Sequence, residues 1–316
     1  MNHPIAININ FDSLNENLGF PKGYRDPSFF EVFDRFMEFS NEYKFKFSIY
    51  IIGKDLENAE INSRVKDWSQ AGHEIGNHSY SHRLNIGGLP EQTLRDEILK
   101  SHGLINNCIG KEPKGFICPG WSTSKKVVSE LIKLNYLYDT SLFPSYLMIP
   151  MVIKNALNHI KRPDKFIEII NRKDIFYPFV KPLTPFFADI NFKKTTYDNP
   201  NKITILPLPA LNRSMALWHT LFFIFGESKT KNKISDYLNK CEYFYYLLHP
   251  ADLIDQNDLE KDRLYTIERI NVPLDDKKRV MREAFELFKN SGRPFVTMQD
   301  IAITFNEREK TVHNNT

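Results

Sequence analysis

Strands and helices alternate between residues 4 and 139, and this alternation constrains the fold more than any other feature of the sequence. Short apolar segments typical of buried strands are each followed by a segment whose apolar residues have helical spacing. Strands separated by helices form parallel sheets, and this many units favour a closed or nearly closed β/α barrel. In such barrels the functional groups lie at the carboxyl ends of the strands.

The rest of the chain is less regular. Residues 145–200 are rich in Phe, Pro and Lys, show no clear period, and are predicted to form a lid-like insertion. We expect one domain over residues 1–305, with this insertion inside it, and a disordered polar tail over 306–316. The predicted strands are 4–11, 45–52, 73–77, 115–118, 137–139, 202–208, 242–248 and 295–298, and the predicted helices begin at 27, 56, 90, 124 and 275.

Composition excludes several classes of protein. The 41% apolar and 13% aromatic content indicates a globular protein with a sizeable core, while a net charge of +3 without a basic run gives no nucleic-acid footprint. The three cysteines are too widely spaced for a disulfide framework or a Cys-based zinc site, so we expect a reduced, cytoplasmic compartment. We expect neither a signal peptide nor a transmembrane segment, because the most apolar run, 215–225, is far shorter than the ~20 residues that span a membrane.

Two histidines four residues apart, His78 and His82, are the strongest chemical signal. They follow the predicted strand 73–77, so they lie at a strand end rather than inside a helix. Neutral imidazoles bind Zn²⁺, and a catalytic zinc site needs three protein ligands and one open position. The pair therefore predicts part of a metal site, with its third ligand elsewhere in the chain.

A series of short motifs at strand ends resembles that of the NodB-type polysaccharide deacetylases. The series runs in the family's order over residues 3–303 and consists of Asn10-Phe11-Asp12-Ser13, His78-Ser79-Tyr80-Ser81-His82, Gly115-Phe116-Ile117-Cys118-Pro119-Gly120, Tyr138-Asp139-Thr140-Ser141 and Leu247-Leu248-His249-Pro250. The resemblance implies a distorted (β/α)7 barrel and a metal-dependent hydrolase that removes an acyl group from a sugar. The substrate would be an N-acetyl or N-formyl sugar or polysaccharide precursor, linked to a lipid or to a nucleotide.

The resemblance makes Asp12 the third metal ligand, because side chains alternate along a strand and Asn10 and Asp12 then face the same side. A second alignment makes Asp12 the catalytic base and Ser13 the ligand, but a neutral hydroxyl is a poor zinc ligand. We favour Asp12, with His78 and His82, as the site of a divalent ion. Zn²⁺ is the expected ion, and iron or cobalt would also suit two imidazoles and one carboxylate.

Two residues that the family uses for catalysis are absent. Related enzymes carry a base Asp at the position of Asn10 and a partner Arg at the position of Ile117. The two losses are physically consistent, because a neutral amide needs no cation and a lone buried Arg would be costly. A hydrolase would then need another route to activate water, such as its direct ionisation at the metal or His249 acting in both steps. The alternative is a catalytically impaired protein that keeps its metal and binds a sugar.

The remaining candidate residues would handle the leaving group and the sugar. The resemblance assigns His249 the role of general acid, and the usual pKa of His suits that role. Asp139 or Asp252 would orient the ring of His249. Pro119, Gly120 and Trp121 would contact the substrate, with the Trp121 ring stacking on a sugar face.

Overall fold

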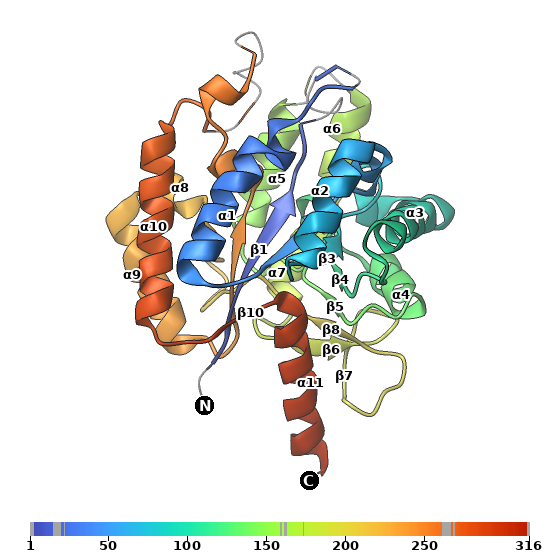
Figure 1. Cartoon of the computed structure of the whole chain (residues 1–316). Helices are drawn as coiled ribbons and strands as arrows, with labels where there is room; N and C mark the ends of the chain where they lie inside the picture. Colours follow the sequence, from blue (N-terminus) through green and yellow to red (C-terminus); the bar gives the residue numbers. More distant parts are fainter. Residues whose placement is uncertain are drawn as a thin grey trace.

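A single ten-stranded sheet runs through the protein, and helices surround it (Figure 1). The computed structural model describes residues 3–14, 20–21, 23–158, 160, 163–172, 174–260, 267 and 269–314. Eight of the described strands are parallel, and seven of them follow one another in the order β9, β1, β2, β3, β4, β5, β8. Their bounds are Phe244–Leu248, Ile5–Phe11, Phe47–Ile51, Glu74–Asn77, Gly115–Phe116, Tyr138–Asp139 and Ile203–Ile205.

This strand order confirms the expected α/β class. The described residues form no ladder between the outer parallel strands β8 and β9, so the barrel is not closed by strand pairing there. Single contacts span that side instead: Tyr245 donates a hydrogen bond to Pro207 O, and His219 N donates to Leu247 O at 3.2 Å. The short strand β10, Phe295–Val296, pairs with the start of β1.

The register of the parallel strands aligns their carboxyl ends. Phe11 of β1 is level with Ile51 of β2, which is level with Asn77 of β3, and Asn77 is level with Phe116 of β4. The chain leaves the sheet directly after this row. The residues that follow the strands therefore gather at one end of the sheet, which is the upper end in Figure 1.

Strand β1 has two different faces. Ile5, Ile7, Ile9 and Phe11 belong to the main apolar core under the helices, whereas Ala6 packs with Tyr50, Ile117 and Tyr138 on the other face. Asn8 and Asn10 share the parity of Ala6 and are also buried. This inner face is polar, because Glu74 accepts hydrogen bonds from Ser48 and Tyr138, and Tyr138 in turn bonds Tyr50 at 2.8 Å.

Capping residues set the starts of the early helices. Asn58 and Ser124 accept hydrogen bonds from the first turns of α2 and α4, and Asp26 caps a 3-10 turn, Pro27–Phe29, that precedes α1. The helices around the parallel strands are α1 Glu31–Tyr43, α2 Ala59–Gln70, α3 Glu91–Ile109, α4 Lys125–Lys133, α8 Leu221–Phe225, α9 Glu227–Lys240 and α10 Leu274–Asn290. No helix in the described part of the chain is long and apolar enough to cross a membrane.

The segment 145–200 is more regular than its sequence indicates. It contains α5 Met148–Asn158, α6 Pro163–Ile170 and α7 Tyr177–Val180, followed by β6 Phe186–Ala188 and β7 Lys194–Thr195. Strand β6 pairs antiparallel with β8 and so extends the sheet, while Val152, Ala156 and Ile169 pack into the main core. The expectation of one domain stays a prediction, and this shared sheet and core support it.

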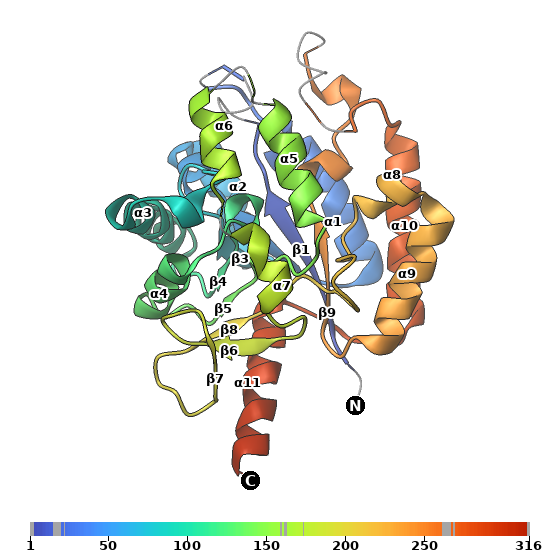
Figure 2. The same cartoon turned by 180° about the vertical axis from the view of Figure 1, so that it is seen from behind.

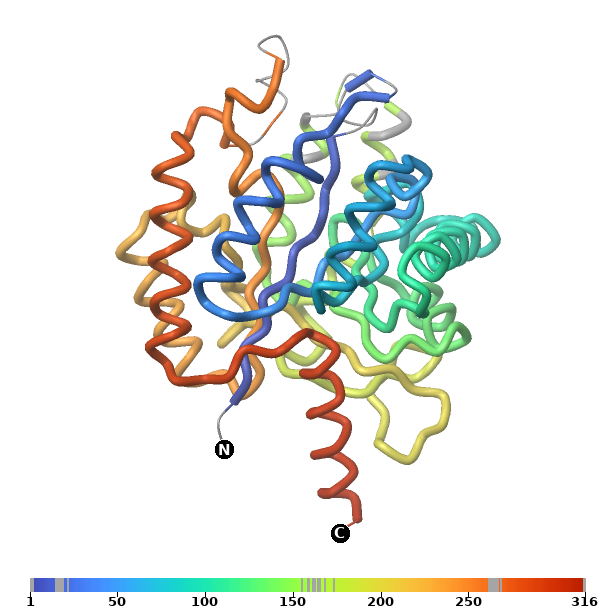
Figure 3. The backbone as a smooth tube through the Cα atoms, in the orientation of Figure 1, coloured from blue at the N-terminus to red at the C-terminus, as the bar shows by residue number. Residues whose placement is uncertain are grey.

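The tail expected to be disordered, 306–316, is helical as far as Asn314 in the described part of the chain. Helix α11 runs from Met298 to Asn314 below the sheet, and Figure 3 shows both chain ends at the end opposite the aligned carboxyl termini. Met298, Ile301 and Phe305 are buried against the sheet. Beyond them, Arg308 pairs with Glu242 and the ring of His313 lies near Tyr197. Contacts with the rest of the protein thus stabilise the last turns of α11, whose polar sequence does not predict a helix.

Candidate metal centre

The carboxyl ends of β1 and β3 bring Asp12, His78 and His82 together. One possible ligand atom from each of the three lies within 4.8 Å of the others. Asp12 Oδ1 is 3.2 Å from His78 Nε2 and 3.1 Å from His82 Nε2. The predicted triad therefore exists as a cluster, and Asp12 is its shared member.

The geometry of the cluster fits a divalent ion. Two ligands on a tetrahedral ion at 2.0–2.2 Å are separated by about 3.3 Å or slightly more, close to both observed distances. His82 Nε2 is buried and faces Asp12 Oδ1, so both atoms point into the same space. His78 Nδ1 lies 2.8 Å from Ile117 O; because a carbonyl only accepts, Nδ1 carries the proton and Nε2 keeps the free lone pair.

The ionisation states of these groups also suit a metal. Burial lowers the pKa of His78, although Asp12 acts in the opposite direction, so that the ring is neutral near pH 7. Partial burial opposes the ionisation of Asp12, but the imidazoles of His82 and His78 outweigh it and hold the pKa of Asp12 well below its usual value. The cluster thus offers a carboxylate from Asp12 and a neutral imidazole from His78, the forms that bind Zn²⁺.

Hydrogen bonds from neighbouring elements hold the loop between the two histidines. Asn77 Oδ1 accepts from Ser79 N at 2.8 Å, and Glu97 of α3 accepts from Ser81 N at 2.8 Å. Ser79 and His82 have φ values of 64° and 55°, in the left-handed region where L-residues need such support. Tyr80 lies between the two histidines in sequence, and its hydroxyl donates a hydrogen bond to Glu57 at 2.9 Å on the exposed side.

The contacts of Ser13 favour Asp12 as the ligand. Ser13 is buried and its hydroxyl hydrogen-bonds to Asp55 in the 3-10 turn Gly53–Glu57 that follows β2. Burial raises the pKa of Asp55 to about 7, against the opposing effect of Ser13. Ser13 therefore faces a carboxylate that stabilises the turn after β1, which supports the first of the two alignments.

His249 faces the cluster from β9, on the other side of β1. Its Nε2 is 4.0 Å from Asp12 Oδ2, too long for a hydrogen bond but close enough to border the same space. Asp252 accepts a hydrogen bond from the backbone N of His249 at 2.8 Å and pairs with Arg269 at 3.0 Å. Burial opposes the ionisation of Asp252, but Arg269 outweighs it and lowers the pKa.

Asp139 and Asp252 hold the main chain around the site. Asp139 accepts hydrogen bonds from Ser141 and, at 3.5 Å, from Thr123, while burial raises the pKa of Asp139 to about 6. Both carboxylates therefore position backbone and hydroxyl groups around the site. Their expected role in orienting the ring of His249 stays a prediction.

A wall of the site comes from the 3-10 turn Pro119–Trp121 after β4. Gly120 and Trp121 have φ values of 56° and 57°, a strained pair that turns the indole toward His249. The Trp121 and His249 rings are 6.5 Å apart and edge-on, and Phe143 packs against the indole. Trp121 Nε1 is buried without a hydrogen-bond partner. The aromatic wall that the sequence predicts is therefore beside the candidate general acid.

Arg172, which the sequence did not single out, supports this wall. Its guanidinium donates to Gly120 O at 2.6 Å and pairs with Asp174 at 2.5 Å, and both side chains of the pair are almost fully buried. An added Cβ at Gly120 would lie 3.2 Å from Arg172 Nη1, so the turn and the guanidinium are in close contact. No signal in the sequence marks Arg172, because it belongs to the segment without a clear period.

Asn10 and Ile117 lie on the inner face of the sheet, as the resemblance implies. Asn10 is buried and its Oδ1 has no hydrogen-bond partner among the described residues. The Ile117 side chain is 1% exposed and packs with Tyr50 and Tyr138. The structure thus places an apolar group where a cation would pair with a base.

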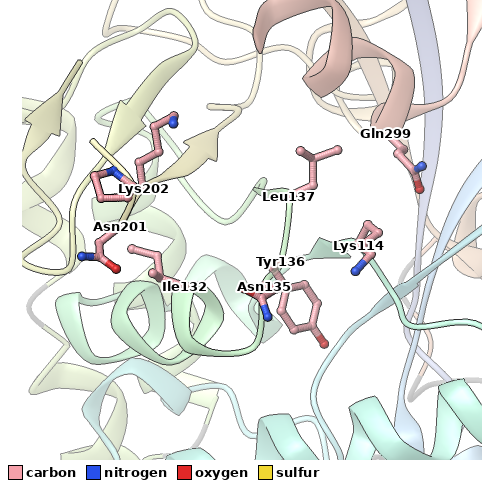
Figure 4. A pocket seen from close by; sticks show the side chains of 9 residues that line it. Lys114, Ile132, Asn135, Tyr136, Leu137, Asn201, Lys202 and Gln299 are labelled. Atoms are coloured by element: carbon pink, nitrogen blue, oxygen red, sulfur yellow. The ribbon is translucent and has the colours of Figure 1, made fainter. Parts of the chain in front are cut away.

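A pocket at the opposite end of the sheet has no comparable chemistry. Figure 4 shows its lining, in which Lys114, Tyr136 and Lys202 come from segments next to the amino ends of β4, β5 and β8. In β/α barrels the functional groups lie at the carboxyl ends of the strands, which is the end opposite this pocket. The pocket therefore does not compete with the cluster as the catalytic site.

Comparison with known proteins points to one family. Residues 9–138 match the sequence profile of the family described as polysaccharide deacetylase. This part of the chain is similar to the polysaccharide deacetylases. A peptidoglycan deacetylase of Helicobacter pylori is 38% identical over 82 residues, 26% of this chain and 28% of that protein. A peptidoglycan-N-acetylglucosamine deacetylase of Bacillus cereus is 33% identical over 78 residues, 25% of this chain and 27% of that protein.

The polysaccharide deacetylase fold extends over the whole chain. A Mycobacterium smegmatis structure assigned to the polysaccharide deacetylases covers 98% of this chain, and 92% of its own chain is covered, with 13% identity and a TM-score of 0.57. The matches to the curated relatives span less than a third of their length, and His249 lies outside the 9–138 match. The sequence similarity is thus limited to residues 9–138, while the similarity of fold extends over nearly the whole chain.

We predict that each of Asp12→Ala, His78→Ala and His82→Ala weakens Zn²⁺ binding by more than ~100-fold, because each removes one of three protein ligands. Metal content after dialysis measures the effect, with circular dichroism as the check on folding. His102→Ala is the matched control, since His102 is a half-buried histidine of α3 that hydrogen-bonds to Tyr136. Stoichiometric zinc in all three variants would show that the ion binds elsewhere.

We predict that Arg172→Met lowers the free energy of unfolding by about 3–5 kcal/mol, because it leaves Asp174 buried and unpaired. The double variant Arg172→Met with Asp174→Leu should recover most of this loss. Chemical denaturation measures both, and Lys114→Met, which breaks the exposed pair with Glu112, should change stability by no more than ~1 kcal/mol. A double variant as unstable as the single one would contradict the pairing.

Proposed function

We propose that the protein is a metal-dependent hydrolase that removes an N-acetyl or N-formyl group from a sugar or polysaccharide precursor. The observation that carries the proposal is the position of His249, whose ring borders the same space as the Asp12–His78–His82 cluster. A candidate acid thus lies beside the candidate metal site, with 4.0 Å between His249 Nε2 and Asp12 Oδ2. This is the arrangement that hydrolysis of an amide requires.

The ion would polarise the acyl carbonyl and lower the pKa of a bound water to roughly 7. The residues of the chain do the remaining work. Asp12, His78 and His82 hold the ion, and the bond from His78 to Ile117 O keeps the ring in the binding tautomer. His249 donates a proton to the departing amine nitrogen, since an amide leaves poorly as an anion. Trp121 presents an apolar wall to the sugar beside this proton donor.

Asn10 favours a second candidate function, that of a sugar-binding protein with impaired catalysis. An amide cannot accept a proton, and losing a general base typically lowers a rate by about 10²–10⁴-fold. The buried, unpartnered Oδ1 of Asn10 is available to accept a hydrogen bond from a ligand. If the protein is a hydrolase, it must activate water without a carboxylate at position 10. A hydrolase would release the acyl group at a measurable rate, whereas a sugar-binding protein would not.

We predict that His249→Ala lowers the turnover of an N-acyl sugar by at least ~100-fold and leaves Zn²⁺ binding intact. The same variant should hydrolyse an aryl acetate almost as fast as the wild type, because a phenolate leaves without being protonated. Release of acetate or formate measures the first reaction, and absorbance of the phenolate the second. His102→Ala serves as the control histidine.

The outcomes of that experiment separate the two functions. If His249→Ala retains full activity on an amide that the wild type hydrolyses, His249 is not the acid. If wild type and variant release no acyl group from a panel of N-acyl sugars but bind one of them by calorimetry, the sugar-binding function holds. In that case the affinity should fall in Trp121→Ala and in the variants of the three metal ligands.

We predict that Asn10→Asp and Ile117→Arg act as a unit. Asn10→Asp alone places a carboxylate in a desolvated site, which raises its pKa, and Ile117→Arg alone buries an unpaired cation and lowers stability. Together they form an ion pair beside the metal, so the double variant should exceed the sum of the single effects on stability and on turnover. A double-mutant cycle measures the coupling, and strict additivity would show that residues 10 and 117 do not pair.

A further inference from the structure

Exposed apolar side chains concentrate in the segment that follows β5. Of the 14 large apolar side chains exposed in the described part of the chain, nine lie between residues 146 and 180. Five of them form what we call the α5–α6 surface, and each is between 47% and 61% exposed: Ile153, Leu157, Ile160, Ile167 and Ile170. Such concentration differs from the scattered single residues that are normal on protein surfaces.

Helices α5 and α6 are apolar on two sides, which is unusual for helices at a surface. Val152 and Ala156 of α5 and Ile169 of α6 face the main core. Ile153 and Leu157, four residues apart, share a different face of α5, and Ile167 and Ile170, three apart, share a face of α6. The core thus accounts for one apolar face of each helix and leaves the other exposed.

The α5–α6 surface lies at the catalytic end of the molecule. Both helices stand at the end toward which β1 points, and Figure 2 shows them in front of it. Asp12 and His78 follow the strands at that same end. Arg172, which comes two residues after α6, contacts the Trp121 turn directly. The surface is therefore next to the site rather than on a remote face.

Positive charge concentrates in the same stretch of sequence. Of the 42 basic and 39 acidic residues of the chain, residues 150–181 contain seven and three. This stretch therefore has a net charge of +4, whereas the remainder of the chain has −1. Lys154, between Ile153 and Leu157, is itself exposed. An apolar surface within a basic stretch is complementary to a layer that is apolar inside and anionic at its boundary.

We propose that the α5–α6 surface docks on an anionic lipid surface. The aliphatic side chains would enter the boundary between headgroups and acyl chains, and the exposed Lys154 would lie among the anionic headgroups. The buried pair of Arg172 and Asp174 takes no part and leaves the net charge of the stretch unchanged. A second copy of the chain is the less suitable occupant, because two stretches of +4 would repel each other. The docking does not depend on the proposed hydrolysis, since it uses none of the site residues.

Docking has a consequence for the substrate, and this part rests on the proposed function. It would hold the Asp12–His78–His82 cluster and His249 close to the headgroup layer. Of the two carriers expected for the sugar, a lipid is the one that this surface would present to the site, whereas a nucleotide-linked sugar needs no lipid surface. Vesicle binding is measured without substrate, so it can succeed whether or not hydrolysis is found.

The test is flotation of the full chain with two kinds of vesicle. One kind is phosphatidylcholine alone, and the other contains about one third phosphatidylglycerol. We expect the wild type to float with the anionic vesicles and to be released by high salt. The double variant Leu157→Glu with Ile167→Glu should bind these vesicles at least about tenfold more weakly, because it places two carboxylates in the docking face.

The matched control is Leu99→Glu with Ile303→Glu, which adds the same charge at two exposed aliphatic positions on α3 and α11. It should bind as the wild type does. Equal loss in both double variants, no binding by the wild type, or equal binding to both kinds of vesicle would each overturn the proposal. A wild-type dimer in sedimentation that becomes a monomer only in Leu157→Glu with Ile167→Glu, without vesicle binding, would show a self-association surface instead.

Discussion

The register of the parallel strands is the constraint on which the site depends. Because Phe11, Ile51, Asn77 and Phe116 are level across β1 to β4, the residues after them leave the sheet at one height. Asp12, His78 and Ile117 are the next residues in three of these strands, and β9 brings His249 to the other side of β1. A slip of one residue would turn Asn10 and its neighbours to the opposite face and separate the ligands.

Much of this arrangement can be predicted from sequence because it is local. Apolar runs, caps such as Asp26 and Ser124, and the alternation of side chains along β1 place the strand ends and favour Asp12 over Ser13 as the candidate ligand. The rest depends on contacts between distant segments. Helix α11 continues through polar residues because it packs on the sheet, and α5 is hard to recognise because both of its faces are apolar. The role of Arg172 depends on its contact with Gly120, which lies 52 residues earlier in the sequence.

The inner face of the sheet shows how the chain tolerates a neutral residue at position 10. Glu74, Tyr138, Tyr50 and Ser48 satisfy one another in a hydrogen-bonded network below the site. Above it, Ile117 is packed by apolar atoms, and Asn10 needs no counter-ion. A charged pair here would have to overcome a desolvation cost of several kcal/mol per ion, which the neutral combination avoids. Stability and catalysis therefore place opposite demands on these two positions.

The hydrogen bond that His78 Nδ1 donates is accepted by the main-chain carbonyl of Ile117, so it does not depend on the side chain at position 117. Any amino acid at position 117 supplies the same carbonyl, so the identity of the side chain can drift while the imidazole stays locked. Mutation at position 117 can thus change the side chain beside position 10 without disturbing the cluster of Asp12, His78 and His82. The scaffold is in this sense modular, because the groups around the cluster can change while the cluster itself stays the same.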